Sequence, residues 1–326
     1  MAPNTPSTDT KTALNRAQDA LKIRHSLLLL LAALIWGTTF VAQSIAARSI
    51  SPFTYNVCRF YVGALVLLPV ALLVGRRDPL APNYDGVPIP GMRPKNARIR
   101  DVRTSGIACG ILLFLAGGLQ QAGIEYTTAG KSGFITALYI ILVPIFGLFL
   151  HKKCPPLVWV SVALAVIGFY LLSVKEGFTV NRGDVLTLAS SCLFAMHILT
   201  VDHFIPRVNG IQLSCIQFIV AGTLSLFPAF LLETPSVSSI LSCIWPILYA
   251  GILSSGVAYT LQIVGQRGLN PTLASLLMSL ESVISALSGW IVLGDSMSSK
   301  ELFGCALVFT GVILAQLPSI RKRRKR

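Results

Sequence analysis

The sequence contains little charge and none of the short motifs that mark the common enzyme classes. Only 12% of its 326 residues are Asp, Glu, Lys or Arg, about half of the share in soluble domains. No GxxxxGK[ST] phosphate-binding loop, HExxH metal site or GxSxG nucleophile motif occurs. The acidic residues of the apolar segments do not cluster as metal–phosphate chemistry requires. We therefore expect no catalytic residue, and ATP-driven pumping is unsupported.

Cysteine provides no framework either. The seven cysteines form no CxxC pair and stand mostly within apolar segments. In that setting cysteine is a small buried hydrophobic residue rather than part of a disulfide set or metal cluster. We expect neither a metal site nor a cofactor.

What the sequence has in abundance is long apolar stretches. Hydrophobic residues make up 53% of the chain, and the mean hydropathy is +0.70. Ten stretches are near the ~20 residues that an α-helix needs to cross a bilayer core. The sequence thus predicts an all-α polytopic membrane protein. Its predicted spans are approximately 27–47, 52–74, 104–124, 129–150, 156–174, 183–201, 211–232, 240–264, 270–293 and 301–318.

The pattern of apolar stretches occurs twice in the sequence. The stretch Leu119-Gln120-Gln121-Ala122-Gly123 aligns with Leu261-Gln262-Ile263-Val264-Gly265, and this offset of 142 residues holds without a gap through Gly147 and Gly289. A repeat with an odd number of spans must enter the bilayer in the opposite sense from its copy. Such inverted repeats are typical of alternating-access carriers, which bind their solute between the two copies.

We predict two inverted five-helix repeats around a central cavity. Arg59-Phe60 in the second span aligns with Gln217-Phe218 in the seventh. Gly106 and Gly110 form a GxxxG pattern that predicts close helix packing. The predicted organisation is a disordered cytoplasmic tail 1–26, a first repeat 27–174 with a basic cytoplasmic loop 75–103, a second repeat 183–318 and a basic cytoplasmic tail 319–326.

The net charge of +14 is distributed unevenly across the predicted membrane. Loops on one side carry 21 of the 27 Lys and Arg, the other side carries five, and Arg59 lies within a span. The positive-inside rule then places both termini in the cytoplasm of a multi-pass protein of the cell membrane. The charge is explained by orientation and by contact with anionic lipid, which argues against a nucleic-acid partner. The oligomeric state stays open.

Four short motifs carry a specific resemblance. In order they are Trp36-Gly37-Thr38-Thr39-Phe40, Arg59-Phe60, Ser279-Leu280-Glu281-Ser282-Val283 and Leu293-Gly294-Asp295. In a duplicated ten-span chain they resemble the EamA-type branch of the drug/metabolite transporter superfamily. The family commonly has Pro where Ser282 stands and Gly-Glu where this chain has Gly-Asp. The resemblance implies a ten-helix carrier of small metabolites or amino acids, often exported, with a cavity built mainly from spans 1, 3, 4, 6, 8 and 9.

Charged residues within spans are the strongest site candidates. Glu281 falls near the middle of the ninth span, where a carboxylate costs about 2.5–3.5 kcal/mol and should face the bundle interior. It is expected to bind a cationic group or carry a coupling proton, or else to lock helices by a structural hydrogen bond. Its equivalent in the first copy is Tyr139. Arg59 is a possible charge partner of Glu281 or of an anionic solute, although such arginines also snorkel to helix ends.

Polar residues at helical spacing predict the cavity walls. One stripe consists of Trp36, Thr39 and Gln43 in the first span, and the other of Ser255, Tyr259, Gln262 and Gln266 in the eighth. Each stripe lies on one helix face, because its members are three, four or seven residues apart. The predicted cavity residues are Trp36, Thr39 and Gln43 in the first span, Gln120 in the third, Tyr139 in the fourth, His197 in the sixth, Tyr259 and Gln262 in the eighth and Glu281 in the ninth. His197 is a candidate proton relay, and its alternative role is packing.

The sequence therefore predicts a secondary transporter that moves a small organic metabolite, an amino acid or related solute, by alternating access, with export as the expected direction. A polytopic membrane enzyme and a non-transporting scaffold or receptor are the alternatives.

Overall fold

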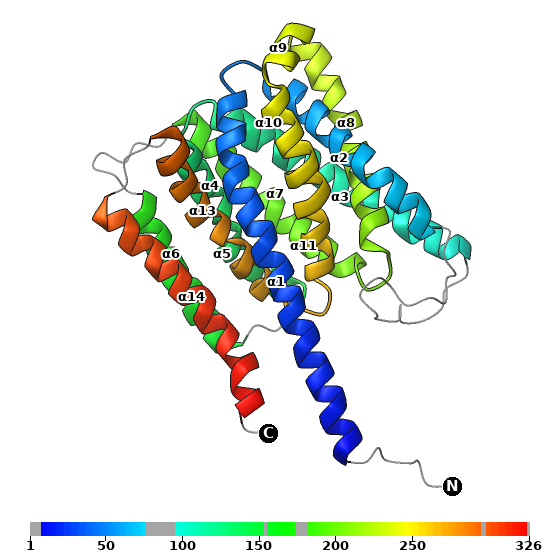
Figure 1. Ribbon diagram of the computed structural model, residues 1–326, viewed down its shortest axis with the longest axis vertical. Helices are drawn as coiled ribbons and strands as arrows, with labels where there is room; N and C mark the ends of the chain where they lie inside the picture. Colours follow the sequence, from blue (N-terminus) through cyan, green and yellow to red (C-terminus); the bar gives the residue numbers. More distant parts are fainter. Residues whose placement is uncertain (1–7, 76–94, 153–154, 174–180, 295–297, 325–326) are drawn as a thin grey trace.

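The computed structural model describes residues 8–75, 95–152, 155–173, 181–294 and 298–324, and every regular element in these ranges is a helix (Figure 1). The first half holds α1 (Thr8–Ala46), α2 (Pro52–Gly75), α3 (Lys95–Ile124), α4 (Ala129–Ala137), α5 (Tyr139–Phe149) and α6 (Pro156–Ser173). The second half holds α7 (Arg182–Phe204), α8 (Gly210–Leu232), α9 (Val237–Ser242), α10 (Ile244–Tyr249), the π-helical η1 (Ala250–Tyr259), α11 (Thr260–Gly265), α12 (Pro271–Met278), α13 (Leu280–Ser288), the π-helical η2 (Gly289–Leu293) and α14 (Ser299–Arg324).

Eight helical segments of the described chain are long and apolar enough to cross a membrane. They match eight of the ten predicted spans: Asp19–Ala46, Pro52–Leu73, Ile99–Ile124, Ala129–Phe149, Arg182–Phe204, Gly210–Leu232, Ile244–Gly265 and Pro271–Leu293. The other two predicted spans fall on α6 and α14, and the apolar stretch of α6, Pro156–Leu171, is shorter than the rest. Helices suit this solvent because lipid offers no partner to backbone N–H and C=O groups.

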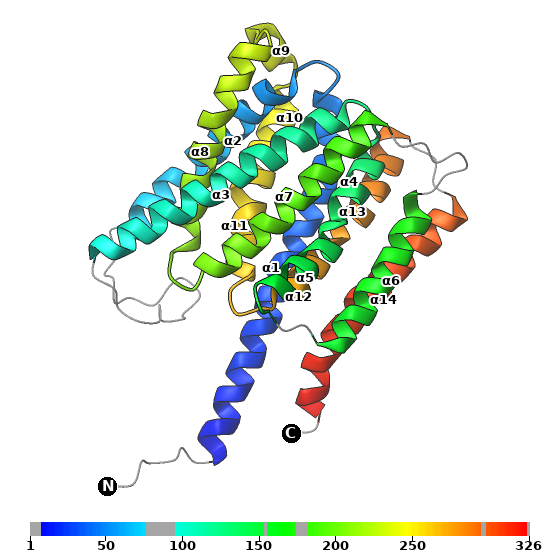
Figure 2. The ribbon, with the colours of Figure 1, turned by 180° about the vertical axis from the view of Figure 1, so that it is seen from behind.

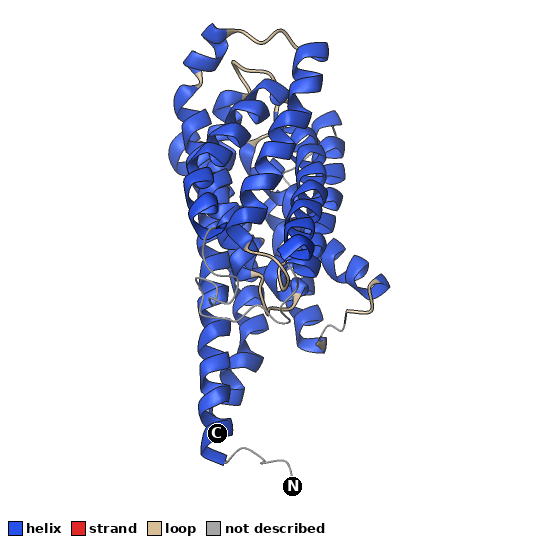
Figure 3. Cartoon of the chain, turned by 90° about the vertical axis from the view of Figure 1, so that its right-hand side faces the viewer, coloured by secondary structure: helices blue, strands red, loops and turns tan. Residues whose placement is uncertain are grey.

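Three segments that were predicted to be polar tails or loops are partly helical in the structure. α1 begins at Thr8, within the predicted tail 1–26, and extends beyond the bundle (Figure 3). α14 continues to Arg324, within the predicted tail 319–326. α3 begins at Lys95, within the predicted loop 75–103, and residues 76–94 of that loop lie outside the described residues.

Two long spans are interrupted at places that differ by one residue in the register of the repeat. The fourth span is divided at Leu138 (φ −61°, ψ −11°) and the ninth at Ser279 (φ −62°, ψ −12°). After each break the chain makes a tighter bond across three residues, from the Ile141 N–H to the Leu138 carbonyl and from the Ser282 N–H to the Ser279 carbonyl. Each break therefore contains a 3₁₀-type bond, and at Leu138 a longer α-type bond from the Leu142 N–H, at 3.4 Å, accompanies it.

The first halves of the two interrupted spans, α4 and α12, also begin alike. Thr128 caps the start of α4 by accepting a hydrogen bond from the Lys131 N–H, and Asn270 caps α12 by accepting one from the Thr272 N–H. The two caps are 142 residues apart, as the repeat requires. A side-chain oxygen before the first turn satisfies a backbone N–H that the helix cannot.

Small residues bring the helices together. α3 lies along α7 and α8, and the predicted GxxxG contact is confirmed: a Cβ added at Gly106 or Gly110 would meet Ile216 or Val220 of α8 at 2.4–2.6 Å. α6 and α14 pack mainly against each other at one edge of the bundle (Figures 1 and 2), and Gly168 lies against the Gly304 carbonyl there. The start of α1 and the end of α14 point toward the same end of the molecule.

Candidate functional site

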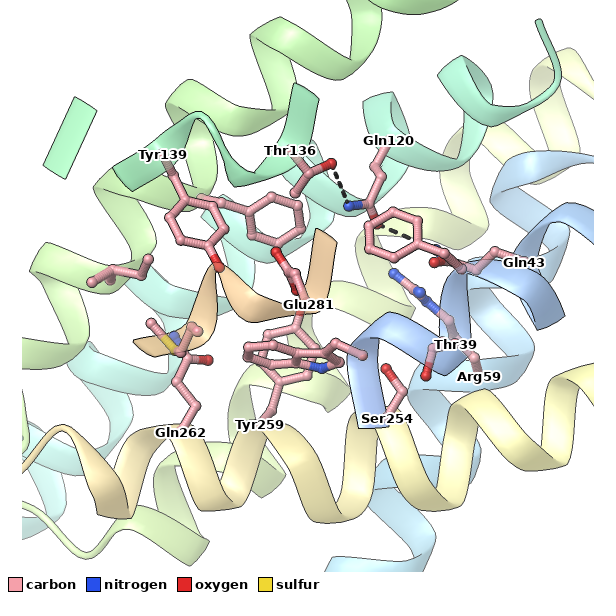
Figure 4. A pocket seen from close by; sticks show the side chains of 15 residues that line it. Thr39, Gln43, Arg59, Gln120, Thr136, Tyr139, Ser254, Tyr259, Gln262 and Glu281 are labelled. Carbon is pink, nitrogen blue, oxygen red and sulfur yellow. Dashed lines mark hydrogen bonds between the residues drawn. The ribbon is translucent and has the colours of Figure 1, made fainter. Parts of the chain in front are cut away.

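The two helix breaks meet at a pocket in the bundle interior (Figure 4). Its empty volume is about 470 Å³, including the part that is open to solvent. Its walls come from the first, second, third, fourth, sixth, eighth and ninth spans, so α2 joins the six spans that the resemblance implies. The lining residues are Trp36, Thr39, Phe40, Gln43, Arg59, Gln120, Thr136, Tyr139, Phe194, Ile198, Ser254, Tyr259, Gln262, Met278 and Glu281.

Most of the predicted cavity residues are brought together here. Eight of the nine line the pocket, and Arg59 does as well. The ninth, His197, is not among the lining residues. Its Nε2 lies 3.0 Å from Oε1 of Gln217, and its ring packs edge-on against Tyr259, with ring centroids 6.0 Å apart. His197 is thus one layer behind the pocket wall, held between α8 and η1.

Glu281 and Tyr139 stand at the helix breaks. Tyr139 is the first residue of α5 and Glu281 the second of α13, so each side chain leaves the backbone next to the tightened turn. They lie beside each other in the pocket. Glu281 is 4% exposed, and its Oε1 has no hydrogen-bond partner. An unsatisfied carboxyl oxygen in this setting is costly, so a proton, cation or solute group there would be stabilising.

A cluster of hydrogen-bonded amide side chains lies at one end of the pocket. Nε2 of Gln43 donates to Oε1 of Gln120 at 3.2 Å and to Oε1 of Gln121 at 3.1 Å. Nε2 of Gln120 donates in turn to Oγ1 of Thr136 at 3.1 Å, and Nε2 of Gln121 donates to the Gln43 carbonyl at 3.2 Å. These bonds join α1, α3 and α4. We call Gln43, Gln120, Gln121 and Thr136 the amide cluster.

The equivalent place in the second repeat lacks such a cluster. Gln262, the equivalent of Gln120, is 2% exposed and its Oε1 has no partner. The position equivalent to Thr136 is Met278, whose thioether cannot replace the threonine hydroxyl as a good acceptor. The amide oxygen of this glutamine therefore has a hydrogen-bond partner in the first copy and none in the second.

Aromatic rings form another part of the wall. The Trp36 and Tyr259 rings meet edge to face with centroids 4.8 Å apart. Tyr259 also contacts Phe218, whose ring stacks on Phe60 at 6.1 Å with an interplanar angle of 10°. Rings with a polar edge suit a site that binds organic solutes, because they offer apolar area together with hydrogen-bonding groups.

Near the start of α4 an ion pair joins two spans. Nζ of Lys131 lies 2.7 Å from Oδ2 of Asp184 at the start of α7. The same Asp184 oxygen accepts from the Asn181 N–H, and Asn181 accepts from the Asp184 N–H. This capping box fixes the start of α7, and the ion pair joins α4 to it.

Six lining residues were not predicted from the sequence: Phe40, Thr136, Phe194, Ile198, Ser254 and Met278. Four of them are apolar and carry no sequence signal that separates cavity from core. Thr136 is a small polar residue between two apolar ones, and Ser254 is the neighbour of Ser255, which belongs to the predicted stripe of the eighth span but does not line the pocket. The repeat gives one hint, since Thr136 and Met278 are equivalent positions and both line the pocket.

Comparisons with known proteins agree on the class of molecule. The model of the EamA-like transporter family matches residues 24–174 and 181–317. An "Uncharacterized transporter" of Archaeoglobus fulgidus is 30% identical over 92% of this chain and 88% of its own. The "Uncharacterized inner membrane transporter YedA" of Escherichia coli is 25% identical over 87% and 88%.

The fold is shared as well. One solved crystal structure superposes with a TM-score of 0.70 over 91% of this chain and 98% of the other, at 20% sequence identity. The family match covers both halves of the chain and nearly all of the helices that build the pocket. The protein is thus a multi-pass membrane transporter that belongs to the EamA-like transporter family.

Proposed function

We propose that the protein is a secondary transporter that carries a small organic solute, an amino acid or related metabolite, through this pocket by alternating access, with export as its natural direction. The observation that carries the proposal is a pocket with polar groups deep in a bundle of apolar helices, bounded by two interrupted spans. Interrupted helices at membrane depth are tolerated where they line a cavity, and carriers place their binding sites there.

An inverted relation between the two repeats is supported by the helix contacts. α1 and α7 are equivalent first spans, as α3 and η1–α11 are equivalent third spans. α3 packs on α7, and α11 packs on α1; α2 packs on η1, and α8 packs on α3. Each contact has its counterpart when the copies are exchanged. Phe60 and Phe218, which are equivalent, stack on each other, as residues beside a two-fold axis would.

The direction of α1 and α7 adds to this support. Phe40, near the end of α1, packs with Ile124 at the end of α3. Gly183, near the start of α7, lies against the Gly123 carbonyl in the same turn of α3. The end of α1 and the start of α7 therefore lie at the same end of the bundle, and the two helices run in opposite directions.

We place both termini in the cytoplasm of a cell membrane. The distribution of Lys and Arg favours this orientation, and the start of α1 and the end of α14 point to the same end of the bundle. In this orientation the amide cluster closes the outer end of the pocket, and Gln262 lies toward the cytoplasm.

Glu281 is proposed to couple transport to protons. It is buried, lies at a helix break and has one carboxyl oxygen without a partner. No ion pair within 4.0 Å joins it to Arg59 or to any other described cation. A carboxyl group that faces the pocket and has no fixed counter-charge is free to exchange a proton for solute as the pocket changes sides.

Counterflow into proteoliposomes tests the function. The full-length protein is reconstituted, loaded with unlabelled solutes from an amino-acid and organic-acid panel, and assayed for uptake of the labelled compound with and without a pH gradient. We expect solute-specific counterflow and a response to the gradient that Glu281→Gln abolishes while the protein stays folded. Absence of counterflow across the panel would favour a scaffold or receptor, and an unchanged gradient response in Glu281→Gln would refute the coupling role.

A further inference from the structure

Arg59 is a buried cation without an anionic partner. Its side chain is 3% exposed, and its Nε and Nη2 atoms have no hydrogen-bond acceptor. No described carboxylate lies within 4.0 Å of it, although Glu281 lines the same pocket. A guanidinium held away from water without an anion is strongly destabilising. The unpaired guanidinium therefore lowers the stability of the folded protein, and an anion bound beside it in the pocket would remove this destabilisation.

The guanidinium is held in a fixed place. Its Cζ lies 4.6 Å from the centroid of the Phe60 ring and 5.7 Å from that of Tyr55. On the other side a Cβ at Gly117 would lie 2.9 Å from Nη2, so the glycine lets the guanidinium lie close to the α3 backbone. Figure 4 shows Arg59 directed into the pocket near Gln43. The position is set by packing, and the hydrogen-bonding edge is left unused.

The second repeat has a neutral residue at the same place, and its oxygen has a hydrogen-bond partner although its Nε2 has none. Gln217 is the equivalent of Arg59, and its Oε1 is 3.0 Å from Nε2 of His197. Tyr259 stands where the first repeat has Gly117, and it fills the space next to that pair. A neutral hydrogen-bonded pair thus occupies one side, whereas the other side has an unpaired cation with space in front of it.

We propose that Arg59 binds a carboxylate of the transported solute. This deepens the proposed function, on which it rests, by restricting the solute to carboxylic acids, with or without an amino group. A guanidinium matches a carboxylate through two parallel N–H···O bonds. It would repel a solute whose only charge is positive, which excludes simple amines as substrates.

The charge of the pocket favours a monoanionic group over a phosphate ester. Arg59 and Glu281 are the charged residues among the lining side chains of the described chain. One positive charge balances one carboxylate, whereas phosphate dianions are usually held by several cationic or backbone donors. An amino group on the same solute would meet Glu281, and the aromatic wall would take an apolar side chain.

Ligand-induced thermal stabilisation of the purified full-length protein tests this without requiring transport. The probes share one aromatic ring and differ in charge: 3-phenylpropionate, phenylalanine, phenethylamine and phenyl phosphate. The variants are Arg59→Gln, which introduces the residue of the equivalent position, and Arg59→Lys, which keeps the charge but not the paired donors. Arg48→Gln removes a charge from the exposed turn after α1 and is the matched control.

We expect the two carboxylates to stabilise the wild type and Arg48→Gln, and phenethylamine to have no effect. Arg59→Gln should weaken carboxylate binding at least a hundredfold and Arg59→Lys at least tenfold; should Arg59→Gln not fold, Arg59→Lys decides. The proposal is overturned if phenethylamine or phenyl phosphate binds the wild type as tightly as phenylalanine, if neither carboxylate binds, or if the Arg59 variants bind like the wild type. Binding without counterflow would contradict only the transport function, and counterflow of a panel compound that Arg59→Gln leaves unchanged would contradict only the role of Arg59.

Discussion

The hydrogen bonds of the amide cluster predict how much a substitution at the closed end of the pocket lowers the free energy of unfolding. Gln43→Leu keeps the size of the side chain approximately constant and removes two hydrogen bonds, to Gln120 and to Gln121. The oxygens of both partners would be left buried. Each such bond contributes about 0.6–1.5 kcal/mol in a membrane protein. The expected loss is therefore about 1–3 kcal/mol in the free energy of unfolding.

The repeat supplies a matched control. Gln262→Leu makes the same chemical change at a residue of the same burial, yet removes no hydrogen bond that the structure records for its Oε1. Burying an unsatisfied amide oxygen is unfavourable, so this variant should be as stable as the wild type or more stable. The assay is equilibrium or thermal unfolding of the three proteins in one detergent.

The order of the three stabilities tests whether the hydrogen bonds of Gln43 stabilise the protein. The structure predicts that Gln43→Leu is the least stable and that Gln262→Leu is not destabilised. Equal losses of stability in the two variants would mean that the two hydrogen bonds of Gln43 contribute nothing beyond what any buried amide contributes. A loss confined to Gln262→Leu would mean that the closed end of the pocket is the one next to Gln262.

Two further predictions concern contacts around the pocket. Gly37→Ala would put a Cβ 2.4 Å from the Ile284 Cβ and force α1 away from α13; we expect a loss of about 1–3 kcal/mol and slower counterflow. Gly130→Ala, whose Cβ would meet Ala286 at an ordinary 3.7 Å, should be neutral, and equal effects of the two would contradict the packing. Asp184→Asn removes the ion pair with Lys131 and should cost about 1–2 kcal/mol in thermal unfolding at low salt, with a smaller difference at high salt; a salt-independent loss would point to the helix cap instead.

The sequence predicted the helices well because their signal is long and repeated. Apolar length identified the spans, and the spacing of Trp36, Thr39 and Gln43 placed them on one face, where all three line the pocket. Glu281 could be predicted to face inward because lipid excludes a carboxylate. In each case one strong solvation term decides the position, and no tertiary detail is needed.

The remaining features depend on packing that no local pattern records. Leu138 and Ser279 interrupt their helices without a Pro or Gly at the break. His197 is adjacent in sequence to the lining residue Ile198, yet a rotation about the helix axis directs it to Gln217. Phe194 and Met278 resemble any core residue. The lack of an acceptor for Arg59 appears only when the neighbouring helices are in place.

The central claim is that the pocket is reached in turn from both sides of the membrane. Thr39 lines it, and its hydroxyl bonds only within α1, to the Ile35 carbonyl. Thr39→Cys, in a variant whose seven native cysteines are replaced, can be labelled in oriented vesicles with a membrane-impermeant thiol reagent supplied to either side. The account predicts reaction from each side, slowed by the transported solute. Reaction from one side alone, under all solute conditions, would contradict it.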